Sequence, residues 1–201
     1  MFIFNYIKPL LYLNVLIQRN NVTDEKLLVE QLKNKATQEI AFRQLMHLYK
    51  KRLYWHIRKI VLSHDDADDI LQNTFIKIYK NIHGFNEESK LYSWMYRIAS
   101  NEAFTFIRQK ATKQHVSMED VQYKMVESLE NDINYTGDEI QLILQKAIVT
   151  LPPKQQLVFN MKYFNEMKYS EMAEILETSV GALKASYFHA VKKIEEYIKS
   201  Y

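Results

Sequence analysis

The sequence predicts an all-α protein made of two small helical domains joined by a flexible acidic linker. Among its 201 residues there are only three glycines and three prolines, so the chain-breaking residues that sheets and hairpins need are rare. Residues that favour helices, such as Leu, Ile, Lys, Glu, Gln and Ala, are abundant. Hydrophobic residues make up 47% of the chain, which is enough to bury cores and excludes disorder throughout.

The composition also excludes several classes of site. The chain contains no cysteine, so it has no disulfide framework, no thiol nucleophile and no cysteine-based zinc site. A reducing compartment suits such a chain, and we expect a cytoplasmic protein. The net charge of +3 is modest. Any binding of nucleic acid must therefore depend on how the charges are distributed along the chain.

Residues 1–22 form an apolar N-terminal extension. Polar or helix-breaking residues interrupt it, which disfavours a membrane-spanning helix: Asn5, Lys8, Pro9 and Asn14. It has neither the cationic start nor the small-residue cleavage site of a signal peptide. Two interpretations stay open, a start codon assigned too early and a genuine docking helix.

Residues 23–115 are predicted to form the first domain. Apolar residues at helical spacing indicate two helices joined near residues 34–37, and the next helix begins at Ser63, followed by four aspartates that favour a helix N-terminus. The apolar stripe of that helix is Ala67, Ile70, Leu71, Thr74, Phe75 and Ile78. After a loop containing Gly84, a further helix dense in aromatic and cationic residues follows.

An acidic segment separates this domain from a second one. Within residues 116–139 one cation, Lys124, stands against seven carboxylates: Glu119, Asp120, Glu127, Glu130, Asp132, Asp138 and Glu139. With Gly137 and few long apolar runs, the segment is predicted to be a linker. Residues 140–201 form the second helical domain, interrupted at Pro152 and Pro153.

The second domain contains the spacing of a helix-turn-helix. The inner face of a short helix is Met172, Ala173 and Leu176; Ser179 caps the next helix, whose inner face is Leu183, Tyr187, Ala190 and Ile194. The opposite face, which a major groove would meet, is Val180, Gly181, Lys184, Ala185 and Phe188. The missing side chain of Gly181 would let the backbone approach DNA, although a plain helical hairpin would show the same apolar pattern.

Aromatic and cationic residues alternate in the first domain, around residues 85–108. Flat side chains can stack on unpaired bases while cations follow the phosphates, as in proteins that bind single-stranded nucleic acid. The alternative is that Trp94, Ile98 and Phe104 fill a core, since aromatic stripes usually do.

The four aspartates in "DDADD" raise the hypothesis of a metal-dependent nuclease. Metal ligands should converge from separate elements, whereas these lie consecutively on one turn, so a dipole-stabilised helix start is favoured. The six histidines lack ligand spacing, and no nucleophile with a base can be identified. The sequence therefore predicts no active site, metal or cofactor.

Three segments, in this order, resemble the sigma-70 family of bacterial RNA polymerase initiation factors in its extracytoplasmic-function (ECF) form. They are "DDADDILQNTFIKIYKNIHGF", similar to the polymerase-binding helix, "SWMYRIASNEAFTFIRQK", similar to the promoter-melting helix, and "LPPKQQLVFNMKYFNEMKYSEMAEILETSVGALKASYFHAVKKI", similar to region 4. The resemblance covers the chain from about Thr23 onward. It implies a non-enzymatic factor that binds core polymerase, recognises the minus 35 and minus 10 promoter elements and promotes strand opening.

The resemblance also implies a role for particular residues. Core-polymerase contacts would come from Asp69, Gln72, Asn73, Ile76 and Lys77. The minus 10 element would meet Gly84, Phe85, Asn86, Trp94, Arg97, Asn101 and Arg108. The minus 35 element would meet Ser179, Val180, Gly181, Lys184, Ala185 and Phe188. The implied partners are the β′ and β subunits of polymerase, promoter DNA and an anti-sigma factor, which can be membrane-bound in this family.

The chain departs from the family pattern at four positions. Asn73 stands where Glu is usual, Thr105 where Asp is common, Glu177 where the turn usually has Gly, and Ser186 where Arg is common. Without that arginine, region 4 has few side chains for bidentate base contacts, so we expect weak DNA binding by the protein alone. A stand-alone helix-turn-helix regulator, which would need its own dimer interface, is the alternative function.

Overall fold

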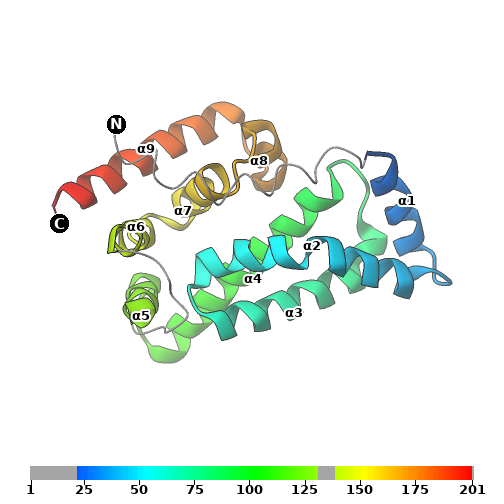
Figure 1. The fold of residues 1–201 in the computed structure, drawn as a ribbon, viewed down its shortest axis with the longest axis horizontal. Coiled ribbons are helices and arrows are strands. Elements are labelled where there is room, and N and C mark those ends of the chain that lie inside the picture. Colours follow the sequence, from blue (N-terminus) through cyan, green and yellow to red (C-terminus); the bar gives the residue numbers. More distant parts are fainter. Residues whose placement is uncertain (1–21, 131–138, 201) are drawn as a thin grey trace. The chain divides into compact units, whose positions relative to one another are not determined.

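The computed structural model describes residues 22–130 and 139–200, and the apolar stretch 1–21 lies outside them (Figure 1). Over the described ranges the chain is helical and has no β-strand, which confirms the predicted fold class. Contacts along the chain divide it into two units, residues 1–43 and residues 44–201. In the described ranges no helix combines the length and hydropathy needed to cross a membrane.

The first unit contains α1 (Val22–Lys33) and the beginning of α2 (Gln38–Val61). The two helices are joined by a turn at the predicted place. The side chain of Asn34 accepts a hydrogen bond from the Ala36 N–H at 3.0 Å, and the Thr37 hydroxyl donates to the Gln31 carbonyl at 2.8 Å. These bonds satisfy backbone groups that the ends of the helices leave without intrahelical partners.

The second unit begins within α2 and continues through α3 (His64–Asn81), a short 3₁₀ turn η4 (Ile82–Gly84) and α4 (Leu91–Gln114). Helix α3 packs along α4. Ser63 caps α3 as predicted, because its hydroxyl accepts a hydrogen bond from the Asp66 N–H at 3.3 Å. All six residues of the predicted apolar stripe of α3 are buried.

A buried polar contact joins α2 to α4. His56 Nε2 lies 2.8 Å from Ser100 Oγ, and Ser100 Oγ donates its own hydrogen to the Tyr96 carbonyl at 2.8 Å. His56 must therefore be the donor through Nε2, which leaves Nδ1 without its proton. Among the described residues Nδ1 has no hydrogen-bond partner. Burial first, and then the charge of Lys59, lower the pKa of His56 to about 3.

We expect this histidine to make the fold sensitive to mild acid. Its pKa is lower in the folded chain than the ordinary value of 6.5, so the unfolded chain takes up the proton first as the pH falls below 6.5. Stability that is fully present above pH 6.5 is then lost progressively toward pH 3. Between about pH 7.5 and about pH 5.5 the loss should be about 1 kcal/mol.

Urea denaturation at the two pH values measures this loss, and His56→Gln is the matched control. The amide can still bond to Ser100 but cannot titrate, so the pH dependence of the variant should be smaller by that amount. Equal pH dependence in both proteins would contradict the assignment.

Part of the predicted linker is folded. Residues Met118–Glu130 form α5, which contacts α4 and α6 and buries Val121, Met125 and Val126. The side-chain amide of Gln122 donates to Gln156 Oε1 at 2.9 Å. This corrects the expectation of a flexible tether over that stretch: apolar residues four and five apart give the acidic helix one buried side. Residues 131–138 of the linker lie outside the described residues.

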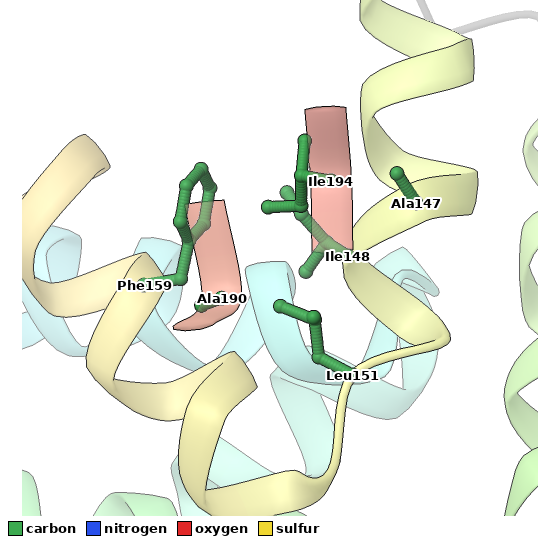
Figure 2. Packing of buried hydrophobic residues seen from close by; sticks show 6 residues of the cluster. All are labelled: Ala147, Ile148, Leu151, Phe159, Ala190 and Ile194. Atoms are coloured by element: carbon green, nitrogen blue, oxygen red, sulfur yellow. The ribbon is translucent and has the colours of Figure 1, made fainter. Parts of the chain in front are cut away.

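The described residues 139–200 form five elements: α6 (Glu139–Val149), α7 (Pro153–Phe159), the π-helical turn η5 (Asn160–Phe164), α8 (Tyr169–Leu176) and α9 (Val180–Lys199). The break at the two prolines is confirmed, and Pro153 starts α7. Figure 2 shows their shared core, in which side chains from α6, α7, α9 and the α6–α7 connection meet: Ala147, Ile148, Leu151, Phe159, Ala190 and Ile194. This core fixes α9 and therefore its outward face.

Candidate nucleic-acid and polymerase interfaces

Helix α9 has two chemically different faces. Leu183, Ala190 and Ile194 are buried, and Tyr187 packs on the core beside them, as predicted. The residues predicted to meet a major groove are all exposed: Ser179, Val180, Gly181, Lys184, Ala185 and Phe188. Ser179 caps the helix, since its hydroxyl accepts a hydrogen bond from the Ala182 N–H at 3.2 Å. Phe188 has 65% of its surface exposed, an unusual position for a large apolar ring.

Gly181 packs against no other residue in the part of the chain that the structure describes. A Cβ added there would meet no atom within 4 Å, and the residue does not have a positive φ. Neither crowding nor backbone conformation requires glycine at the second position of α9. The outer side of α9 is open at this position.

The turn between α8 and α9 keeps the left-handed geometry that usually calls for glycine. Glu177 adopts φ 48° and ψ 48°, and its N–H donates to the Ala173 carbonyl. A non-glycine residue in this conformation costs about 1–2 kcal/mol. On α8, the predicted Met172 is buried together with Ile175, whereas Ala173 and Leu176 are half-buried. Ile175 was not among the predicted inner residues of α8, although its spacing of three from Met172 indicates the same face.

Helix α4 carries the residues predicted for the minus 10 element. Trp94, Arg97, Asn101 and Arg108 are spaced by three, four and seven positions, which places them on one side of the helix. Asn101 and Arg108 are exposed, whereas Trp94 and Arg97 are half-buried. The helix thus offers two cations and an indole ring along one side.

The loop before α4 has exposed and buried members. Gly84 and Asn86 are exposed, but Phe85 is only 3% exposed and its ring centroid lies 5.3 Å from that of Trp94. This corrects the expectation that Phe85 meets DNA directly, because its ring is already used in packing. Phe85 instead supports Trp94 from below the surface.

The five residues predicted to contact polymerase share one side of α3. Asp69, Gln72, Asn73, Ile76 and Lys77 are all exposed. Ile76 has 50% of its surface exposed, and Lys77 pairs with Glu102 on α4. Tyr79, which the sequence analysis missed, is 40% exposed and lies three residues after Ile76. The two side chains give α3 an exposed apolar strip bordered by polar groups.

The aspartates at the start of α3 do not converge. Asp66 pairs with Lys110 Nζ at 3.2 Å, and Asp68 lies 3.8 Å from the ring of His64. Within the part of the chain that the structure describes, no group of three or more acidic or histidine side chains is arranged to hold a metal ion. The geometry favours the helix-start interpretation, with Asp65 and Asp66 in the first turn.

Comparison with known proteins identifies the family of this chain. The family model for sigma-70 region 2 matches residues 45–113, and the model for sigma-70 region 4 matches residues 141–194. The chain is 30% identical over 155 residues to the ECF RNA polymerase sigma factor SigW of Bacillus subtilis, covering 72% of this chain and 81% of SigW. It is 27% identical to the ECF RNA polymerase sigma-E factor of Haemophilus influenzae, covering 79% of this chain and 88% of that protein.

Solved structures show the same fold. CnrH in complex with the cytosolic domain of CnrY matches with a TM-score of 0.62 at 17% identity, covering 88% of this chain and 97% of that chain. The sigma factor RpoE in complex with the anti-sigma factor NepR from Bartonella quintana matches with a TM-score of 0.58 at 20% identity, covering 79% of this chain and 96% of that chain.

The sequence matches lead to one family rather than to a stand-alone regulator. Regions 2 and 4 occur in the expected order and are joined by the acidic segment. The chain belongs to the extracytoplasmic-function group of the sigma-70 family, the bacterial factors that bind core RNA polymerase, recognise promoters and start transcription.

Proposed function

We propose that three exposed faces of this sigma factor divide its work among core polymerase, the minus 10 element and the minus 35 element. The observation that carries the proposal is the outer side of α9, where an exposed phenylalanine, a lysine and a glycine without an internal role lie together. The other two faces lie on α3 and α4, and the buried sides of these helices hold them in place.

The polymerase-binding face is the outer side of α3. Ile76 supplies apolar contact, and Asp69, Gln72, Asn73 and Lys77 surround it with polar groups. An exposed apolar centre with a polar rim is the usual composition of a protein interface. Asn73 contributes an amide where a carboxylate is usual in the family, so it can donate a hydrogen bond as well as accept one.

The minus 10 face is the loop with Gly84 and Asn86 together with the outer side of α4. Trp94 offers a ring for stacking, while Arg97 and Arg108 neutralise phosphates and Asn101 offers hydrogen bonds to a base edge. The free energy gained by holding an unstacked base drives strand opening. No nucleotide hydrolysis by this chain is needed, so we propose a factor without enzymatic activity.

The minus 35 face is the outer side of α9. Lys184 can reach a phosphate or a guanine, Val180 and Ala185 can pack on thymine methyl groups, and Ser179 can bind a phosphate besides capping the helix. Only one cation lies among these residues, and Ser186 replaces a possible second one. Polymerase supplies the remaining affinity by holding both regions on one promoter.

The family also suggests where and with what the protein works. We place it in the cytoplasm with polymerase and promoter DNA. The solved relatives CnrH and RpoE are each bound to another protein, the cytosolic domain of CnrY and the anti-sigma factor NepR. We propose an anti-sigma factor as a further partner of this chain.

Site-specific photo-crosslinking in an initiation complex tests the assignment of faces. A photoreactive residue at Asn101 should crosslink to the non-template strand of the minus 10 element, and one at Ala185 should crosslink to the minus 35 duplex. A probe at Glu195, exposed near the end of α9, is the matched control and should give little product. The proposal would be contradicted if the two probes crosslinked to each other's promoter element, or if all three probes gave equal amounts of crosslinked product.

Gly181→Ala should separate stability from DNA binding. Alanine has the higher helix propensity and a Cβ meets nothing there, so we expect the free energy of unfolding to rise by about 0.5 kcal/mol. The added methyl group should nevertheless weaken the use of the minus 35 element by about tenfold, because it holds the helix away from the groove. Urea denaturation and run-off transcription measure the two effects, and unchanged transcription would contradict the close approach.

A further inference from the structure

Three carboxylates on α8 and its C-cap contact the N-cap and the N-terminal half of α4. Glu171 Oε1 lies 3.8 Å from Lys90 Nζ, Ser93 Oγ donates to Glu174 Oε2 at 3.4 Å, and Glu177 pairs with Arg97. The carboxylates are spaced by three positions, and their partners by three and four. Successive turns of one helix therefore meet successive turns of the other.

The contact extends beyond the charged pairs. Ser93 is buried, and Tyr92 beside it is half-buried. Burial first, and then the Glu171 carboxylate, raise the pKa of Tyr92, with a smaller contribution from Glu174. The carboxylates of α8 therefore also act on Tyr92, a residue within α4, and not only on the charged ends of Lys90 and Arg97.

The partner of Glu177 is one of the residues proposed to bind minus 10 DNA. Arg97 keeps 34% of its side chain exposed, while Glu177 keeps 71%. Glu177 occupies a left-handed turn position where glycine would be free of strain, so backbone geometry does not explain this residue. Its contact with Arg97 does give the carboxylate a role.

We propose that the acidic face of α8, formed by Glu171, Glu174 and Glu177, competes with the minus 10 strand for α4 in the free protein. The competition rests on the proposed DNA-binding role of α4. The Glu177 carboxylate pairs with Arg97, the cation that a DNA phosphate would otherwise contact. The same contact keeps α8 against α4. Binding to polymerase and promoter DNA separates the two helices and releases Arg97.

Charge reversal tests the contact without using DNA. Because the chain has no cysteine, Lys113→Cys and Lys193→Cys give two unique sites for spin labels, both exposed and outside the α8–α4 contact. In this background Arg97→Glu and Glu177→Arg should each shift the label-to-label distance distribution that pulsed EPR measures for the parent, since each places like charges together. The double variant should restore it.

Failure of the double variant to restore the distance, or no change in either single variant, would overturn the contact. A general loss of structure is distinguished by circular dichroism, because the two single variants should keep the helical signal of the parent chain.

Binding of a single-stranded minus 10 oligonucleotide to the full chain tests the competition. Fluorescence anisotropy should show two- to fivefold tighter binding by Glu177→Gln, a size set by the weakness of solvent-exposed ion pairs. Glu195→Gln removes the same charge from an exposed place on α9 and should change binding much less. If Glu177→Gln and Glu195→Gln increase the affinity for the oligonucleotide equally, the proposed competition is wrong. A different outcome is that the double variant restores the distance but none of the proteins binds the single strand. That result would overturn the proposed DNA-binding role of α4, while the contact between α8 and α4 would still hold.

Discussion

Replacing Phe159 by alanine should lower the free energy of unfolding of the C-terminal helices by about 3–5 kcal/mol. The side chain is 3% exposed and belongs to the core shown in Figure 2. Its ring stacks on Tyr163 and Tyr187, with centroid distances of 5.1 and 5.9 Å, and meets Phe164 edge-on. The substitution removes these ring contacts and leaves a cavity between α6, α7 and α9.

Phe188→Ala is the matched control, because it makes the same chemical change at an exposed position of the same domain. Its effect on unfolding should stay within about 0.5 kcal/mol. Urea denaturation followed by circular dichroism measures both variants. Similar losses in the two would contradict the packing of the core as described.

Replacing Ile76 by aspartate should weaken binding to core polymerase at least about 30-fold, which corresponds to a hot-spot loss of about 2 kcal/mol or more. The side chain is half exposed on α3, so the substitution removes little packing within the protein. In the complex it would place an unpaired carboxylate in the apolar centre of the interface, where desolvation is costly. Fluorescence anisotropy with labelled protein and sigma-free core measures the affinity.

Ile140→Asp serves as control for this variant. Ile140 is 57% exposed on α6, outside the proposed polymerase-binding face. Its substitution should change core binding by less than about threefold, the range typical of surface positions outside an interface. If both variants bind core polymerase like the unchanged protein, α3 is not the docking helix.

The parts of the fold that follow from local pattern could be predicted from the sequence. Apolar spacing alone located both faces of α9, and the serine followed by four aspartates located the start of α3. In each case the signal lies within one helix, where side chains three and four positions apart share a face. The exposed residues of the candidate site were predictable for the same reason.

The features that depend on contacts between distant segments could not be predicted. The acidic segment folds as α5 because Val121, Met125 and Val126 find an apolar surface that composition does not reveal. Phe85, which was predicted to meet the minus 10 element, packs its ring against Trp94. The pairing of Glu177 with Arg97, residues eighty positions apart, depends on how α8 meets α4.

Run-off transcription with sigma-free core polymerase on fragments of the source genome tests the central claim most directly. The account predicts discrete start sites that share two upstream sequence blocks, at the minus 35 and minus 10 positions, and that vanish when the protein is omitted. Absence of stimulated transcription, together with absence of a complex with core polymerase in size-exclusion chromatography, would contradict it.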